Sequence, residues 1–262
     1  MILRDLSAAV TALTCMAAPS FAAPAIPQCA GDVEIADARI VRIEHNGVLV
    51  LQDGRAASLE GIRIPMATQD HAPQPASDQS FDALSAFAKD QDLALHAMWP
   101  KEDRYDRVRS QAFTNDGTWL QIELLKRGLA RVNISPDRTE CASEMFAAEA
   151  EARNAHLGLW AQPAYAVRTP DTVKADVGTF QIVQGVVLNA DVRDGRAYLN
   201  FGPDWKTDFT VTISPDDMKT FRAMGVDPRG YKGKFMRVRG IVQWLNGPEM
   251  ELADPRQAEV FQ

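Results

Sequence analysis

Arginine and carboxylate side chains gather in a short part of the sequence and could bind an anion together. Arg104, Arg107 and Arg109 follow one another closely, and Arg63 lies further upstream. A guanidinium suits a phosphate because its planar fork donates hydrogen bonds in pairs. The same arginines could instead form ordinary ion pairs with acids that are near them in the sequence: Glu60, Glu102, Asp103 and Asp106. The sequence leaves both interpretations open.

No other group of reactive residues has a spacing that predicts a site. The histidines lie far apart, without the short spacing that places two imidazoles on one metal: His45, His71, His96 and His156. Ser80, Ser85 and Ser110 lie in no nucleophile-elbow context. Redox catalysis is not indicated either, since the sequence has no Cys-x-x-Cys pair. We therefore expect neither a metal nor a cofactor.

The composition is that of a folded protein with an excess of acidic residues. The chain has 262 residues, with 28 Lys and Arg against 35 Asp and Glu, and 46% of its residues are hydrophobic. These values exclude collagen-like and disordered classes, and the length suits one large domain or two small ones. The net charge of −7 argues against a protein that binds nucleic acid through bulk positive charge, although a local basic patch stays compatible.

Residues 1–22 have the features of a secretory signal peptide. Arg4 precedes an apolar stretch from Leu6 to Ala18, and Ser20-Phe21-Ala22 fits the small-x-small cleavage pattern. The apolar stretch is shorter than the roughly 20 residues that a membrane-spanning helix needs. We therefore expect cleavage near Ala22 and an exported protein, periplasmic or secreted, without a transmembrane anchor.

Cleavage at this point would leave two cysteines, Cys29 and Cys141. Two cysteines in an exported chain favour a disulfide. It would close a loop of about 110 residues and stabilise the fold by up to about 4–5 kcal/mol on the chain-entropy model. Two unrelated thiols are the alternative.

The first half of the chain combines strand and helix patterns. A β-meander is expected from Asp37 to Ile64, because its apolar runs are separated by the turn signals Asn46-Gly47 and Asp53-Gly54. Residues 67–80 are expected to form a loop. The segments beyond it are predicted as a helix at 80–88, strands at 93–98 and 111–114, and helices at 119–129 and 143–156.

The second half begins with a predicted linker at 162–178, which holds two prolines and few apolar residues. Alternating patterns then predict strands at 180–187, 198–201, 209–213, 235–244 and 250–252, with a short helix at 215–224. Five strands with one helix after the third is the element order of an OB-like β-barrel. We therefore expect a mainly β chain with helices (α+β) and two domains, at 30–161 and 179–262.

Several short segments of the first domain form a recognisable set. They are Leu59-Glu60-Gly61-Ile62-Arg63-Ile64-Pro65, Asp103-Arg104-Tyr105-Asp106-Arg107, Asn115-Asp116-Gly117, Leu124 to Val132, and Glu149 to Trp160. In order and spacing, this set resembles the staphylococcal-nuclease-like, or thermonuclease, family. The resemblance implies a five-stranded OB-like barrel with three helices that cleaves DNA or RNA with calcium. Residues 179–262 resemble, more loosely, the OB-like domain appended to some bacterial members.

Most positions that carry the family's chemistry hold other residues in this sequence. By the resemblance, Gly47 and Arg63 replace acidic metal ligands, and Met66 replaces the general base. Ser58 replaces an arginine that binds phosphate, and Arg107 alone is retained. Because Arg63 puts a positive charge where a cation should sit, the resemblance implies that the calcium-dependent mechanism is lost.

The first hypothesis is therefore an exported binding or scaffold protein that needs no cofactor, with Arg63, Arg104 and Arg107 marking an anion site. Its partner would be a protein, a glycan or another anionic ligand. The alternative is an active periplasmic nuclease that uses calcium, with Arg107 catalytic and Glu60 and Asp106 as replacement carboxylates.

Nucleic acid binding is less favoured by charge. Aromatic and basic residues in the second domain could bind single strands, but basic and acidic residues nearly balance there. The simpler interpretation is that the aromatic residues fill a small barrel and the basic ones solvate its surface.

Overall fold

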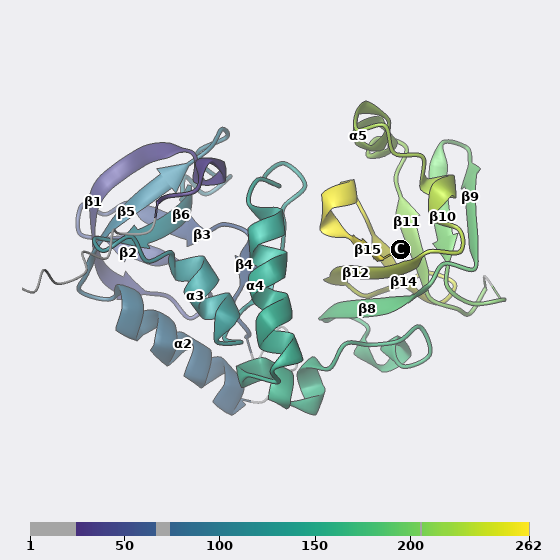
Figure 1. Ribbon diagram of the computed structural model, residues 1–262, viewed down its shortest axis with the longest axis horizontal. Coiled ribbons are helices and arrows are strands. Elements are labelled where there is room, and N and C mark those ends of the chain that lie inside the picture. Colours follow the sequence, from purple (N-terminus) through teal and green to yellow (C-terminus); the bar gives the residue numbers. More distant parts are fainter. Residues whose placement is uncertain (1–24, 67–73, 205, 262) are drawn as a thin grey trace, which may run out of the picture.

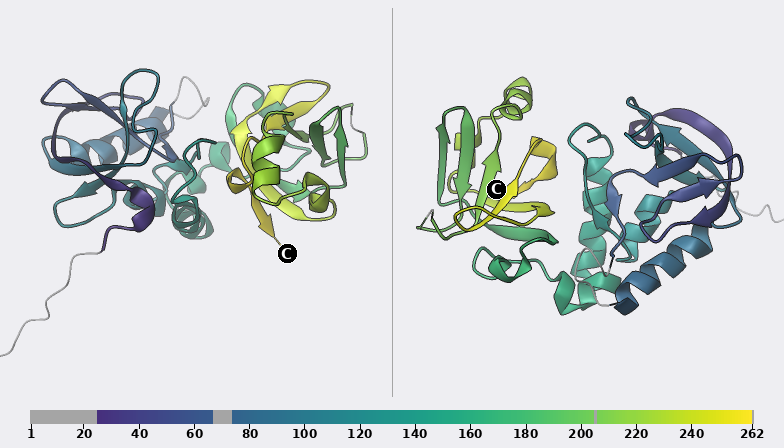
Figure 2. Two further views of the ribbon diagram at one scale, coloured as in Figure 1. Left: turned by 90° about the horizontal axis from the view of Figure 1, so that it is seen from above. Right: turned by 180° about the vertical axis from the view of Figure 1, so that it is seen from behind.

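The computed structural model describes residues 25–66, 74–204 and 206–261, so the predicted signal peptide at 1–22 lies outside the described residues. The described chain forms two β domains, and helix α4 (Ala142–Asn154) lies on the side of the first domain that faces the second (Figure 1). Figure 2 shows the two domains from two further sides. The predicted α+β class, with a five-stranded barrel followed by a second small β domain, is confirmed.

The first domain is built on a closed barrel with the strand order β1-β2-β3-β6-β5. Strand β3 pairs with β6 in parallel, and the other neighbours pair antiparallel. Aliphatic side chains such as Ile40, Leu49 and Leu95 fill the interior, because alternate residues of a strand point to the same face. The strands are β1 (Asp32–Ile43), β2 (Leu49–Leu51), β3 (Ala56–Leu59), β5 (Asp92–Ala97) and β6 (Val108–Thr114).

Helices α2 (Gln74–Ala88), α3 (Leu120–Lys126) and α4 accompany this barrel, together with a two-stranded sheet of β4 (Ile62–Arg63) and β7 (Arg131–Val132). The prediction of a loop up to residue 80 was wrong at its end, since α2 begins at Gln74. Pro75 fits there because the first turn of a helix does not use its backbone N–H groups. Ser80 is fully buried inside the helix.

The predicted disulfide is present between Cys29 and Cys141, whose Cα atoms lie 5.2 Å apart. It ties the short 3₁₀ turn before β1 (Gln28–Ala30) to the residue that precedes α4. The bond therefore fastens the start of the barrel to the helix that faces the second domain.

The second domain has a five-stranded sheet, β13-β14-β11-β10-β9, and a three-stranded sheet, β15-β12-β8, around one apolar core. Strand β11 pairs with β14 in parallel, as β3 does with β6 in the first domain. The elements are β8 (Phe180–Val186), β9 (Asn189–Arg193), β10 (Arg196–Asn200), β11 (Thr210–Ile213), α5 (Met218–Ala223), β12 (Phe235–Ile241), β13 (Gln243–Trp244), β14 (Pro248–Glu251) and β15 (Glu259–Phe261).

Three features of this domain differ from the sequence prediction. Strand β15 was not predicted. Strand β9 was missed, because only Ala190 and Val192 of its five residues face the core and the others are polar. The strand predicted at 235–244 is interrupted at Val242, which is buried between β12 and β13. The chain changes there from one sheet to the other.

The connecting segment is ordered and packed. It contains two short 3₁₀ turns (Pro163–Tyr165 and Val173–Asp176), and Val173 is buried in the core of the second domain. Arg168 donates hydrogen bonds to Asp176 and to the carbonyl oxygens of residues 163, 164 and 166. These contacts limit the freedom of the connection between the domains.

None of the helices in the described ranges combines the length and the apolar character that crossing a bilayer requires.

Candidate functional site

A pocket of about 200 Å³ lies on the first domain, where the β1–β2 turn, β3, β4 and the segment before β6 meet. Five of the residues that line it are those singled out from the sequence: Gly47, Ser58, Arg63, Met66 and Arg107. The tertiary structure therefore brings these distant positions together. Asn46 and Asn133 add two amide side chains to the wall, and neither was singled out from the sequence.

The tight β1–β2 turn sets one wall of the pocket. The side-chain oxygen of Asn46 accepts the backbone N–H of Val48 at 3.1 Å, and Gly47 has a φ of +86°. A Cβ atom on Gly47 would lie 3.0 Å from Cγ1 of Ile64. Any residue with a side chain at position 47, including an acidic metal ligand, would thus be strained and crowded.

Arg63 is placed by strand β4, which pairs with β7 so that Arg63 lies opposite Arg131. The guanidinium of Arg63 lies 5.4 Å from the ring centroid of Phe180, a buried residue of the second domain. A cation over an aromatic face is attracted by the ring quadrupole. The second domain thus helps to hold Arg63, a contact that no pattern in the sequence indicated.

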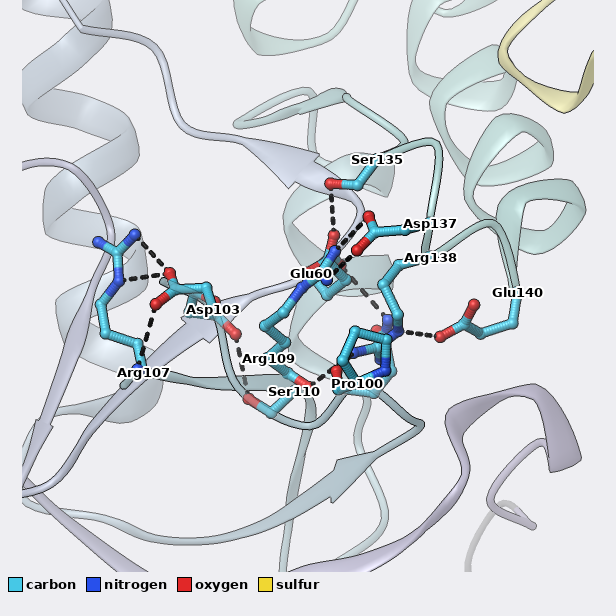
Figure 3. Close-up of polar contacts among 12 residues, drawn as sticks. Glu60, Pro100, Asp103, Arg107, Arg109, Ser110, Ser135, Asp137, Arg138 and Glu140 are labelled. Carbon is cyan, nitrogen blue, oxygen red and sulfur yellow. Dashed lines mark hydrogen bonds and ion pairs between the residues drawn. The ribbon is translucent and has the colours of Figure 1, made fainter. Parts of the chain in front are cut away.

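Arg107 is held by a turn that Asp103 organises (Figure 3). Asp103 accepts the backbone N–H groups of Tyr105 and Arg107 at 2.8 and 3.2 Å, and the Arg107 Nε donates to its second oxygen at 2.7 Å. Burial alone would raise the pKa of Asp103, but these hydrogen bonds outweigh it and hold the pKa below its ordinary value. Arg107 therefore enters the pocket with its charge already paired with a carboxylate.

Arg104 and Asp106 belong to the same turn but not to the pocket lining. The guanidiniums of Arg104 and Arg107 lie 4.8 and 4.9 Å from the ring centroid of the exposed Tyr105. Asp106 has a φ of +58° and is exposed. Of the proposed anion-binding arginines, the structure brings Arg63 and Arg107 to one pocket and leaves Arg104 beside it.

Glu60 lies in a separate buried cluster (Figure 3). Its carboxylate accepts Nε of Arg109 at 2.7 Å and the hydroxyl of Ser135 at 2.8 Å. Arg109 also donates to both oxygens of Asp137, and hydrogen bonds from Arg109 to Asp137 and Glu60 raise its pKa further above the ordinary range. Glu60 therefore does not line the pocket, and Arg109 forms the ordinary ion pairs that the sequence allowed.

The pocket residues do not fit calcium. Calcium takes six to eight oxygen ligands and usually several carboxylates. The polar side chains of this lining are Asn46, Ser58 and Asn133, together with the guanidiniums of Arg63 and Arg107. The lining offers a cation no carboxylate, and the positive charge of Arg63 opposes a divalent cation. Across the described parts of the chain, no group of three His, Cys, Asp or Glu residues could hold a metal ion.

We predict that the ion pair between Asp103 and Arg107 contributes less to stability at acidic pH. The pKa of Asp103 is lower in the folded state than its unfolded value of 3.8. The stabilisation of the fold by the ionised Asp103 is therefore complete above pH 3.8, and it is lost as the pH falls through the lower pKa of the folded state. We expect Asp103→Asn to cost about 0.5–1 kcal/mol at pH 7 and less at pH 3. Urea titrations at both pH values measure this, and an equal loss at both would contradict the ionic account.

Comparison with known proteins agrees with the geometry. Residues 58–162 match the model of the family described as staphylococcal nuclease homologue. The match includes Ser58, Arg63, Met66 and Arg107 of the pocket. No curated protein matches the chain.

Proposed function

We propose that this protein, whose residues 58–162 form a staphylococcal nuclease homologue domain, is exported and binds a ligand without the calcium-dependent nuclease chemistry. The ligand would present an anionic group to Arg63 and Arg107. In this proposal the nuclease-like fold positions the residues of the pocket, and the pocket binds the anionic group of the ligand.

The observation that carries this proposal is the composition of the pocket. Hydrolysis of a phosphodiester needs a cation held by carboxylates and a base that positions water. By the resemblance, Arg63 and Met66 replace a metal ligand and the general base, and the pocket lining contains no carboxylate. Two guanidiniums and the hydroxyl of Ser58 are instead hydrogen-bond donors, which suits an anion that binds without a metal.

Export is supported by two observations. Residues 1–22 have the pattern of a secretory signal peptide, and Cys29 and Cys141 form a disulfide. Disulfides persist in oxidising compartments such as the periplasm and the cell exterior. The ligand would therefore be an extracellular or periplasmic molecule.

A digestion assay tests the loss of catalysis. The chain from Ala23 onward would be incubated with single-stranded DNA and with RNA, in calcium, magnesium, manganese, zinc or EDTA. We expect no cleavage in any of these solutions, with circular dichroism showing a folded protein. Metal-dependent cleavage that disappears in Arg107→Ala would overturn the proposal in favour of an active nuclease. Cleavage that persists in Arg107→Ala would identify a contaminating enzyme, to be removed before the assay is repeated.

A binding assay tests the anion site itself. We expect inorganic phosphate or adenosine monophosphate to bind in EDTA, and Arg63→Ala or Arg107→Ala to weaken binding about 10- to 100-fold, because a hydrogen bond to a charged group contributes about 1.5–3 kcal/mol. Arg104→Ala is the matched control, since Arg104 belongs to the same turn and does not line the pocket. Equal effects of Arg104→Ala and Arg107→Ala would contradict a specific site.

A further inference from the structure

A second and larger pocket, of about 380 Å³, opens on the outward face of the five-stranded sheet of the second domain. This volume is in the range of small-molecule sites. The pocket is lined by residues of β9, β10, β11 and β14 and by the turn between β13 and β14. It is separate from the pocket of the nuclease-like domain and shares no residue with it.

Strand register places the polar lining residues in rows across the sheet. Asn189, Asn200, Thr210 and Glu249 lie side by side on four neighbouring strands, and Tyr198 lies opposite Asp191. Their neighbours along the strands face the core, because successive side chains alternate between faces: Ala190, Leu199, Val211 and Met250. The outward face of this sheet thus carries polar side chains in regular rows.

Hydrogen bonds fix several of these side chains. Thr210 donates its hydroxyl to the Asn200 side-chain oxygen at 3.1 Å, and the Thr212 hydroxyl donates to one oxygen of Glu249 at 3.1 Å. Among the described residues, the amide nitrogen of Asn200 and the second oxygen of Glu249 have no such partner. An amide that donates and a carboxylate that accepts therefore lie on the same face, already oriented.

The charge of the lining decides the class of ligand. The lining contains three carboxylates, on Asp191, Asp194 and Glu249, and one guanidinium, on Arg193. This balance repels a nucleic acid or another polyanion. Asp191 is already paired with Arg193, whose Nε donates to it at 2.8 Å, so little net attraction remains for a basic peptide at that point.

The backbone also disfavours a peptide. A peptide that binds by strand addition needs a free sheet edge. The lining side chains stand on the face of the sheet, over β9, β10, β11 and β14, and of these strands only β9 lies at an edge. Adjacent donors and acceptors, with the aromatic plane of Tyr198, instead match vicinal sugar hydroxyls, each of which both donates and accepts.

We propose that this pocket binds a neutral oligosaccharide. The strand face of OB-folds is known to accept oligonucleotides and oligosaccharides. The acidic lining favours oligosaccharides here because it repels the phosphates of an oligonucleotide. The inference does not depend on the function proposed for the first domain, because the two pockets are distinct. The exported protein would thus combine an anion site and a saccharide site on one chain.

Isothermal titration tests this proposal with named probes. Maltotetraose, cellotetraose and N-acetylchitotetraose would be titrated into the chain from Ala23, in EDTA, beside an eight-nucleotide oligothymidylate and octalysine. We expect at least one neutral tetrasaccharide to bind with a micromolar to millimolar Kd and the two charged probes not to bind. Tyr198→Ala and Asn200→Ala should each weaken the binding about tenfold, and Glu249→Gln several-fold.

The matched control is Glu251→Gln, the same change two residues along β14, where the side chain does not line the pocket. Circular dichroism would confirm that each variant is folded. If Tyr198→Ala is not folded, Tyr198→Phe replaces it as a variant that keeps the aromatic ring. Failure of all three tetrasaccharides to bind at millimolar concentration would overturn the proposal. So would binding that Asn200→Ala and Glu249→Gln leave unchanged, or octalysine binding that Glu249→Gln removes.

Discussion

Replacing Glu149 by alanine is expected to lower the free energy of unfolding by about 3–5 kcal/mol, because it removes the carboxylate from a buried ion-pair network. The Glu149 side chain is fully buried. It accepts the backbone N–H of Val132 at 2.7 Å, Arg239 Nη1 at 2.8 Å and Arg153 Nη1 at 3.0 Å. Without it, two arginines and one backbone donor lose a buried acceptor.

This network crosses between the domains, which explains the size of the expected loss. Glu149 lies on α4 of the first domain, and Arg239 lies on β12 of the second. The Arg239 side chain is 2% exposed and also donates to Glu259 and to the carbonyl oxygen of Val132. A guanidinium buried to this extent cannot replace the lost carboxylate with water.

Two further contacts join the same surfaces. Arg131 donates Nη1 to the carbonyl oxygen of Phe180 at 2.8 Å, and Gln257 donates its amide to the carbonyl oxygen of Ile134 at 2.9 Å. We therefore expect Glu149→Ala to loosen the contact between the domains as well as the first domain. Because Phe180 contacts Arg63, the substitution should also weaken phosphate binding in the first pocket.

Urea denaturation followed by tryptophan fluorescence measures the change. Glu151→Ala is the matched control, since Glu151 lies two residues further along α4 and is exposed. The control should stay within about 0.5 kcal/mol of the original chain. A loss below about 1 kcal/mol for Glu149→Ala would show that the network contributes little net stability.

Removing the disulfide is expected to cost up to about 4–5 kcal/mol on the chain-entropy model. The bond joins residues 112 positions apart, so reduction restores the freedom of almost half the chain in the unfolded state. Cys141 is 4% exposed and packs in the core of the first domain, so alanine is a better replacement there than serine. The expected loss refers to the Cys29→Ala/Cys141→Ala double variant.

Reducing the disulfide in the original chain provides an internal control for the double variant. Urea titrations with and without dithiothreitol should separate strongly for the original chain. The double variant should give the same curve in both solutions, at the position of the reduced original chain. A reduced chain that is as stable as the oxidised one would contradict the chain-entropy account of this bond.

Glu60 illustrates why the sequence alone did not place every site residue. Two residues after Ser58, it would share the same face if strand β3 continued. The strand ends at Leu59, however, and the chain turns at Gly61, which has a φ of +85°. A Cβ there would clash with Sδ of Met145, so the turn is closely packed. The turn directs Glu60 to Arg109 and Ser135.

The sequence by itself determined the elements whose hydrophobic pattern is strong and the positions of the nuclease-like pocket. Alternating apolar residues predict the strands because one face of each strand is buried, and the family resemblance points to Gly47, Ser58, Arg63, Met66 and Arg107. It also predicted the disulfide between Cys29 and Cys141. These features depend on local pattern or on composition.

The tertiary structure decided what depends on contacts between distant residues. It placed Phe180 beside Arg63, joined Glu149 to Arg239, and made the polar strand β9 part of a lined pocket. Side-chain partners across a domain boundary have no fixed spacing in the sequence, and a strand with few core-facing residues has a weak pattern. Only packing of the whole chain selects such partners.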